Sequence, residues 1–129
     1  FGTLKKVASG GELSRIMLSI KAILSQFKTL PTIIFDEIDT GVSGEVAYKI
    51  ADIMDHMGKY MQVMTITHLP QVAAKGAHHF KVYKETRDGS TFTQLKKLHQ
   101  QERIEEVAQM LAGDALSDTA LQHAKELLN

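Results

Sequence analysis

The chain has 129 residues, of which 43% are hydrophobic and 23% charged, and its 15 basic residues balance 15 acidic ones. This length and composition suit one small globular domain, and the zero net charge argues against a domain that binds nucleic acid through bulk positive charge. The absence of cysteine excludes disulfides and cysteine-based zinc sites, and no apolar run approaches the ~20 residues that a membrane helix needs.

The first half of the chain alternates helical and strand patterns. Apolar residues at intervals of three and four predict an amphipathic helix from Leu13 to about Phe27 and another over 46–57. Short apolar runs at 32–35 and 62–67 predict strands that are buried on both faces. A proline then opens a short helix over 70–75.

The second half predicts a β-hairpin followed by two helices. β-Prone runs at 80–85 and 91–98 flank an Asp-Gly pair, which is a strong hairpin signal. A third helix runs through 104–111 to a glycine, and a fourth begins at Ser117 or Asp118. The order of elements predicts an α/β fold in a single domain, residues 1–129, with parallel strands joined by helical crossovers.

Polar residues follow both predicted parallel strands. Asp36 and Glu37 end the first strand, and His68 follows the second. Ligands bind at the carboxyl ends of parallel strands, so these three side chains form a candidate site. Adjacent strand residues point to opposite faces, so one carboxylate can support Mg²⁺ while the other handles a water molecule, as phosphoryl transfer requires. The ordinary alternatives are two hydrated carboxylates and a surface histidine.

A second candidate site lies near the start of the chain, at Ser9, Gly10, Gly11 and Glu12. Backbone N–H groups in a glycine turn that opens a helix form an anion site, and the serine adds a hydroxyl donor. The alternative is a plain capping box, in which Ser9 caps the helix and Glu12 stands three residues later. The two interpretations are compatible.

One part of nucleotide chemistry is missing from the sequence. No segment of the form GxxxxGK[ST], which cradles the phosphates of a nucleotide, occurs in the 129 residues. The chain also begins with Phe1 rather than methionine. We therefore expect a piece of a longer protein that cannot hold a nucleotide in the usual way by itself.

Four motifs in order resemble the C-terminal half of an ABC-type ATPase head. SGGELSR resembles the signature motif, TIIFDEID the Walker B strand, TGVSG the D-loop and TITH the switch-histidine segment. DEID in place of DEPT is similar to the SMC-related branch. Within that branch, the flanks IIFDEIDTGVSGEVA, THLPQVAAKGAHHF and EEVAQMLAG resemble the RecN family of bacterial DNA-repair proteins. The resemblance implies the C-terminal lobe of a P-loop NTPase fold, with parallel strands, a β-hairpin and C-terminal helices.

The resemblance also implies catalytic and metal-binding roles. Asp36 would support Mg²⁺ through water, and Glu37 would orient or deprotonate the attacking water. His68 would contact the γ-phosphate of ATP and help to sense it.

Further roles follow for residues at the ATP-mediated head–head interface. The turn from Ser9 to Glu12 would contact the γ-phosphate of an ATP held by the opposite subunit. Asp39 and Ser43 bound a segment that would cross the dimer interface. Many heads carry Asp where this chain has Ser43, which puts an Asp-specific D-loop role in doubt here.

The resemblance implies ATP, Mg²⁺ and three partners for the full protein. These partners are a second head, an N-terminal lobe with Walker A beyond a coiled coil, and DNA. The expected function is ATP-driven holding or bridging of DNA in double-strand break repair and recombination, in the cytoplasm at the nucleoid. The isolated chain is expected to be inactive. No membrane partner is expected.

Three alternatives stay open at this point. The chain could come from the head of another SMC-like chromosome or recombination ATPase, or it could be a non-catalytic dimerisation module. The triplet Asp39-Thr40-Gly41 also matches the DTG of aspartic proteases, which are mostly β-strand. The helical pattern that begins a few residues later disfavours a protease.

Overall fold

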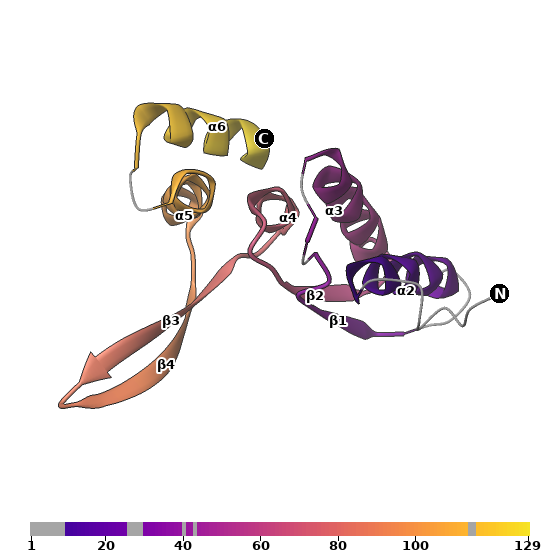
Figure 1. Ribbon diagram of the computed structural model, residues 1–129, viewed down its shortest axis with the longest axis horizontal. Coiled ribbons are helices and arrows are strands. Elements are labelled where there is room, and N and C mark those ends of the chain that lie inside the picture. Colours follow the sequence, from indigo (N-terminus) through magenta and orange to yellow (C-terminus); the bar gives the residue numbers. More distant parts are fainter. Residues whose placement is uncertain (1–9, 26–29, 40, 43, 114–115) are drawn as a thin grey trace. The chain divides into compact units, whose positions relative to one another are not determined.

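A computed structural model describes residues 10–25, 30–39, 41–42, 44–113 and 116–129, without the side chains of 10–15, 24 and 25. Among these residues the chain forms two compact units. Unit 1 spans Phe1–Lys75 and unit 2 spans Gly76–Asn129. Helices and strands alternate in unit 1, whereas a hairpin precedes two helices in unit 2 (Figure 1).

Unit 1 has the predicted order of helices and strands: α2 (Gly10–Ser25), β1 (Thr32–Asp36), α3 (Glu45–Gly58), β2 (Gln62–Ile66) and α4 (Pro70–Lys75). The two strands are parallel and in register, from Thr32 opposite Gln62 to Asp36 opposite Ile66. This confirms the predicted parallel pair with a helical crossover. Helix α2 begins three residues before the predicted start, because a first turn needs no apolar residue.

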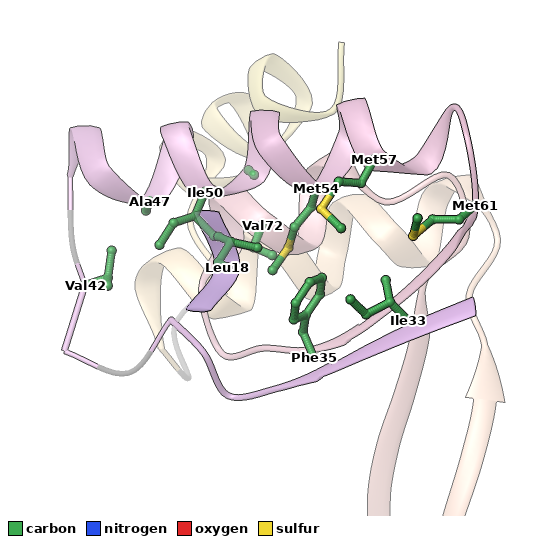
Figure 2. Close-up of a cluster of buried hydrophobic side chains, with 11 residues drawn as sticks. Leu18, Ile33, Phe35, Val42, Ala47, Ile50, Met54, Met57, Met61 and Val72 are labelled. Atoms are coloured by element: carbon green, nitrogen blue, oxygen red, sulfur yellow. The ribbon is translucent and has the colours of Figure 1, made fainter. Parts of the chain in front are cut away.

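The core of unit 1 lies between β1 and α3. Figure 2 shows Ile33 and Phe35 pointing from the strand toward Met54 and Met57 of the helix. Burying a side chain the size of Phe35 contributes about 2–3 kcal/mol. This core fixes the strand pair and therefore the position of the strand ends. Its buried members are Leu18, Ile33, Phe35, Val42, Ala47, Ile50, Ala51, Met54, Met57, Met61 and Val72.

The prediction that the strands are buried on both faces is wrong for this chain. Ile33 and Phe35 are buried, but Ile34 between them is 62% exposed. On β2, Met64 is 50% exposed and Ile66 56%. Among the described residues, core packing covers one face of the strand pair and leaves an apolar stripe on the other. We call the side chains of Ile34, Met64 and Ile66 the open face.

Unit 2 begins with an antiparallel hairpin. Strands β3 (Phe80–Arg87) and β4 (Ser90–Lys97) pair along their whole length. Asp88 and Gly89 form the turn with φ angles of 50° and 75°. Positive φ at both central residues is the geometry that Asp-Gly favours, so the predicted hairpin is confirmed.

Two helices complete unit 2. Helix α5 (Gln100–Ala112) ends at Gly113, and α6 (Asp118–Leu128) packs against it. The side chain of Ser117 accepts a hydrogen bond from the N–H of Ala120 at 3.1 Å, so Ser117 is the cap. The buried residues of this helix pair are Val107, Ala108, Ala120 and Ala124.

In the part of the chain that the structure describes, no helix is long and apolar enough to cross a membrane. The helix α3 follows the Asp39-Thr40-Gly41 triplet after a few residues, and strands make up a minority of the described elements. The aspartic-protease interpretation is therefore wrong.

Candidate active site

The carboxyl ends of β1 and β2 bring together the residues that the sequence marked. Asp36 is the last residue of β1 and lies opposite Ile66, the last residue of β2. The backbone N–H of Glu37 donates to the carbonyl oxygen of Ile66 at 3.0 Å. His68 follows two residues later. The predicted common edge for Asp36, Glu37 and His68 is therefore present.

Glu37 has an unusual backbone. Its φ angle is 46°, in the left-handed region that residues with a side chain seldom adopt. The hydrogen bond to the Ile66 carbonyl anchors the residue there. Strained backbone held in place by its surroundings is concentrated at functional sites. The backbone hydrogen bond therefore holds the Cα of Glu37 just beyond the sheet edge, with its side chain exposed.

Asp36 is the last residue of β1, and its carboxylate is exposed. Among the described residues, no three His, Cys, Asp or Glu side chains gather into a metal cage. Mg²⁺ typically takes one or two protein carboxylates and completes its shell with water and substrate phosphates. A single accessible carboxylate at Asp36 fits that mode of binding.

Asp39 is buried, unlike the two carboxylates before it. Its side chain is 1% exposed, and its Oδ2 accepts a hydrogen bond from the hydroxyl of Thr67. That hydroxyl in turn accepts from the backbone N–H of Leu69 at 3.0 Å. The Oδ1 of Asp39 lies 4.0 Å from the Nδ1 of His68, whose side chain is 60% exposed. The segment after Glu37 is thus tied to the segment after β2.

The hydroxyl of Thr67 also explains why strand β2 ends one residue before its predicted end. Thr67 uses its hydroxyl to bind the N–H of Leu69, and such local side-chain bonds compete with the strand ladder. His68 therefore lies just after the end of the strand, with an exposed side chain. Helix α4 then begins at Pro70.

Several predicted site residues lie wholly or partly outside the part of the chain that the structure describes. Ser9 and Ser43 lie outside the described residues, and so does the proposed capping box. Gly10, Gly11 and Glu12 form the first turn of α2, with side chains that are not described.

Three side chains of unit 2 have shifted pKa values. Burial, followed by the positive charge of Arg103, holds the pKa of His79 below its ordinary value. A hydrogen bond from the backbone N–H of His99 and another from Lys96 lower the pKa of Glu102. Its hydrogen bond to Glu102 raises the pKa of Lys96. A cavity of about 540 Å³ in this unit is lined by no predicted site residue.

Known proteins resemble the chain closely in sequence. It is 52% identical over 126 residues to the DNA repair protein RecN of Bacillus subtilis. It is 46% identical over 125 residues to RecN of Vibrio cholerae and 44% identical over 127 residues to RecN of Deinococcus radiodurans. The chain resembles RecN along nearly its whole length. No family model matches it.

The match to RecN covers 97–98% of this chain but 22–23% of those three proteins. The chain therefore spans about a fifth of the length of the curated RecN relatives. The resemblance inferred from the four motifs is confirmed.

Solved structures of SMC proteins share the fold. The Smc head domain with a coiled coil and joint from Pyrococcus yayanosii matches with a TM-score of 0.65 and 23% identity, over 78% of this chain and 19% of that one. A protein from work on ATP-driven dimerisation of SMC ATPases matches with a TM-score of 0.62 and 21% identity, over 85% and 66%. The predicted ATPase-head fold is confirmed.

The sequence did not reveal the contact between Asp39, Thr67 and His68. The sequence predicts for Asp39 only a place in an interface segment, with no role inside its own chain. A weak signal existed, because a carboxylate three residues after one strand and Thr-His after its parallel neighbour must lie near the same edge. Burial of Asp39 itself could not be read from local pattern.

Proposed function

We propose that the chain is the C-terminal lobe of an ATPase head in a longer, RecN-type protein. The observation that carries this proposal is the parallel pair β1–β2, with Asp36 and Glu37 at one end and His68 at the adjacent end. Sequence identity of 44–52% to RecN proteins and the SMC-head fold support it. The full protein hydrolyses ATP, and this activity serves DNA repair.

Each residue at the strand ends has one role in the proposed site. The Asp36 carboxylate supports Mg²⁺, which neutralises phosphate oxygens. Glu37 orients or deprotonates the attacking water, and its anchored backbone supports this role because a positioned base must be held in place. His68, exposed on the turn after β2, contacts the γ-phosphate.

The signature turn acts across a dimer interface. Ser9, Gly10, Gly11 and Glu12 contact an ATP held by a second head, since backbone N–H groups at the start of α2 can bind phosphate oxygens. Asp39 and Ser43 bound the segment that meets the second head. Closure around ATP and reopening after hydrolysis let the protein hold or bridge broken DNA, in the cytoplasm and associated with the nucleoid.

The open face is evidence that another part of the longer protein packs against the strand pair. Ile34, Met64 and Ile66 present apolar side chains on one face of a parallel pair, and parallel sheets are usually covered on both faces. The curated relatives are several times longer than this chain. We assign the cover of this face to the N-terminal lobe, which also brings Walker A.

The test is Glu37→Gln in the full-length protein. The variant keeps the shape of the side chain but lacks the base, so ATP-dependent association of heads should persist while turnover falls about 10²–10⁴-fold. Steady-state phosphate release and light scattering with ATP measure the two properties. Near-normal hydrolysis would remove Glu37 from the proposed role.

A matched control is Glu45→Gln. Glu45 opens α3 with an exposed side chain and pairs with Lys49 at 2.7 Å, which is a surface pair of small energetic value. The same chemical change at this position should leave both turnover and head association at wild-type levels.

A further inference from the structure

Asp39 is a buried carboxylate with one oxygen satisfied and one unused. The Oδ2 accepts from the Thr67 hydroxyl, whereas Oδ1 is buried with no hydrogen-bond partner among the described residues. A buried carboxylate is costly unless its oxygens are hydrogen-bonded or paired with positive charge. Its side chain is 1% exposed, so water is a poor substitute. The unused oxygen therefore needs a donor from nearby.

His68 supplies the donor that lies within reach. Its Nδ1 is 4.0 Å from Oδ1, which is longer than a hydrogen bond but close enough for a small ring rotation to form one. The ring is largely exposed, so rotation meets little packing. Hydrogen bonds of catalytic groups are often long without substrate and tighten when it binds.

Thr67 holds the carboxylate in a fixed direction. Because its hydroxyl oxygen accepts from the N–H of Leu69, its proton is directed to Asp39. The carboxylate then turns Oδ1 toward the residue that follows Thr67 in the chain. The same short turn therefore fixes both Asp39 and the backbone of His68.

We propose that Asp39 is a positioning residue for His68. Its Oδ1 accepts the Nδ1–H of the imidazole, which sets the ring orientation and leaves Nε2 to face the ligand. Neighbouring carboxylates fix histidine tautomers in this way in many sites. The inference rests on the proposed ATPase function and adds a connection between the interface segment that starts at Asp39 and the γ-phosphate contact at His68.

The experiment compares Asp39→Asn in two backgrounds of the full-length protein. Asparagine keeps the size of the side chain but loses the charge. In the wild-type background kcat should fall about 10- to 100-fold, by analogy with removal of the partners that orient metal-bound histidines, with KM for ATP within about twofold. In a His68→Gln background the same change should cost no further activity, because Asp39 acts through the ring. Equal losses in both backgrounds would overturn the proposal.

Variants of Thr67 provide a second measurement that does not alter Asp39. Thr67→Val removes the hydroxyl that holds the carboxylate and should lower kcat in the same direction as Asp39→Asn. Thr67→Ser keeps the hydroxyl and should restore most of the activity. Unchanged kcat in Thr67→Val, or no rescue by serine, would contradict the role of the hydroxyl. This pair decides the question if Asp39→Asn does not fold.

Two controls separate this inference from the proposed function. Asp52→Asn makes the same chemical change on the exposed side of α3, where Asp52 pairs with Lys75 at 3.0 Å, and should leave kcat unchanged. If the wild-type protein hydrolyses ATP and Glu37→Gln abolishes turnover, but Asp39→Asn is as active as wild type, the positioning role alone fails. If the wild-type protein shows no hydrolysis, the proposed function fails first.

Discussion

Carboxylates close together in the sequence have opposite environments in this chain. Glu37 is exposed on strained backbone at the sheet edge, whereas Asp39 is buried against Thr67. Exposure suits a group that meets water and substrate, and burial suits a group that holds another side chain. The difference in environment, rather than residue type, is what separates a candidate base from a candidate positioning residue.

His79 gives a pH-dependent prediction for unit 2. Burial, followed by repulsion from Arg103, lowers its pKa from the ordinary 6.5. The unfolded chain therefore binds more protons than the folded chain once the pH drops below about 6.5, so the free energy of unfolding should fall there. Above that pH both states are neutral at this position and the contribution vanishes. Amide hydrogen exchange over 76–129, followed from about pH 7.5 to about 5.5 and corrected for intrinsic exchange rates, measures the effect.

The control for this prediction is His79→Gln, which removes the titrating group from a position where Nδ1 is buried and lacks a hydrogen-bond partner among the described residues. The pH dependence of exchange protection should become flatter in the variant. An equally steep dependence would assign the effect to other groups.

At the scale of elements, the hairpin and α3 each contain a glycine, and the two differ in whether their backbone conformation requires glycine. Gly89 has a φ of 75° in the turn, whereas Gly58 ends α3 without positive φ, and an added Cβ meets nothing within 4 Å at either place. Gly89→Ala should therefore cost about 1–2 kcal/mol from backbone strain alone. Gly58→Ala should stabilise by about 0.5–1 kcal/mol, because alanine loses less entropy in a helix.

Urea unfolding of the two variants measures both changes against wild type, and Gly58→Ala serves as the control for adding a methyl group. If both substitutions changed stability in the same direction, the difference in φ between the two positions would not be the cause. A neutral Gly89→Ala would indicate that the turn can adopt another type.

The sequence predicts best those elements that are determined by residues close together in the chain. The hairpin follows from the Asp-Gly pair, and α3 follows from apolar spacing, so the sequence predicts both with nearly correct ends. The exposure of Ile34 depends on what covers the sheet, and no local pattern contains that information. The choice between Ser117 and Asp118 as cap depended on a single hydrogen bond to Ala120.

The same distinction holds for the candidate site. Parallel pairing alone brings Asp36, Glu37 and His68 to one edge, so topology inferred from the sequence was sufficient to group them. The burial of Asp39 and its contact with Thr67 required packing of the loop after β1, which depends on side chains far apart in the chain. The sequence therefore predicts which candidate residues share one edge of the sheet, whereas the packing that buries Asp39 is seen only in the folded chain.

At the scale of the whole molecule, the proposed site is incomplete within these 129 residues. No GxxxxGK[ST] segment is present to grip the β- and γ-phosphates, and the open face lacks a cover among the described residues. The isolated chain should therefore show no ATP hydrolysis above a buffer blank, even with Mg²⁺ and a large excess of ATP.

Co-expression with the remaining part of the longer protein should restore turnover, because it supplies the phosphate loop and covers Ile34, Met64 and Ile66 together. Phosphate release from the purified chain, the purified remainder and the co-expressed pair measures this directly. Glu37→Gln in the pair is the control, since any residual activity in that variant comes from a contaminant or another base. Turnover by the isolated chain that persists through several purification steps and disappears in Glu37→Gln would show that the chain binds phosphates without the missing loop, and the proposed division of the site would be wrong.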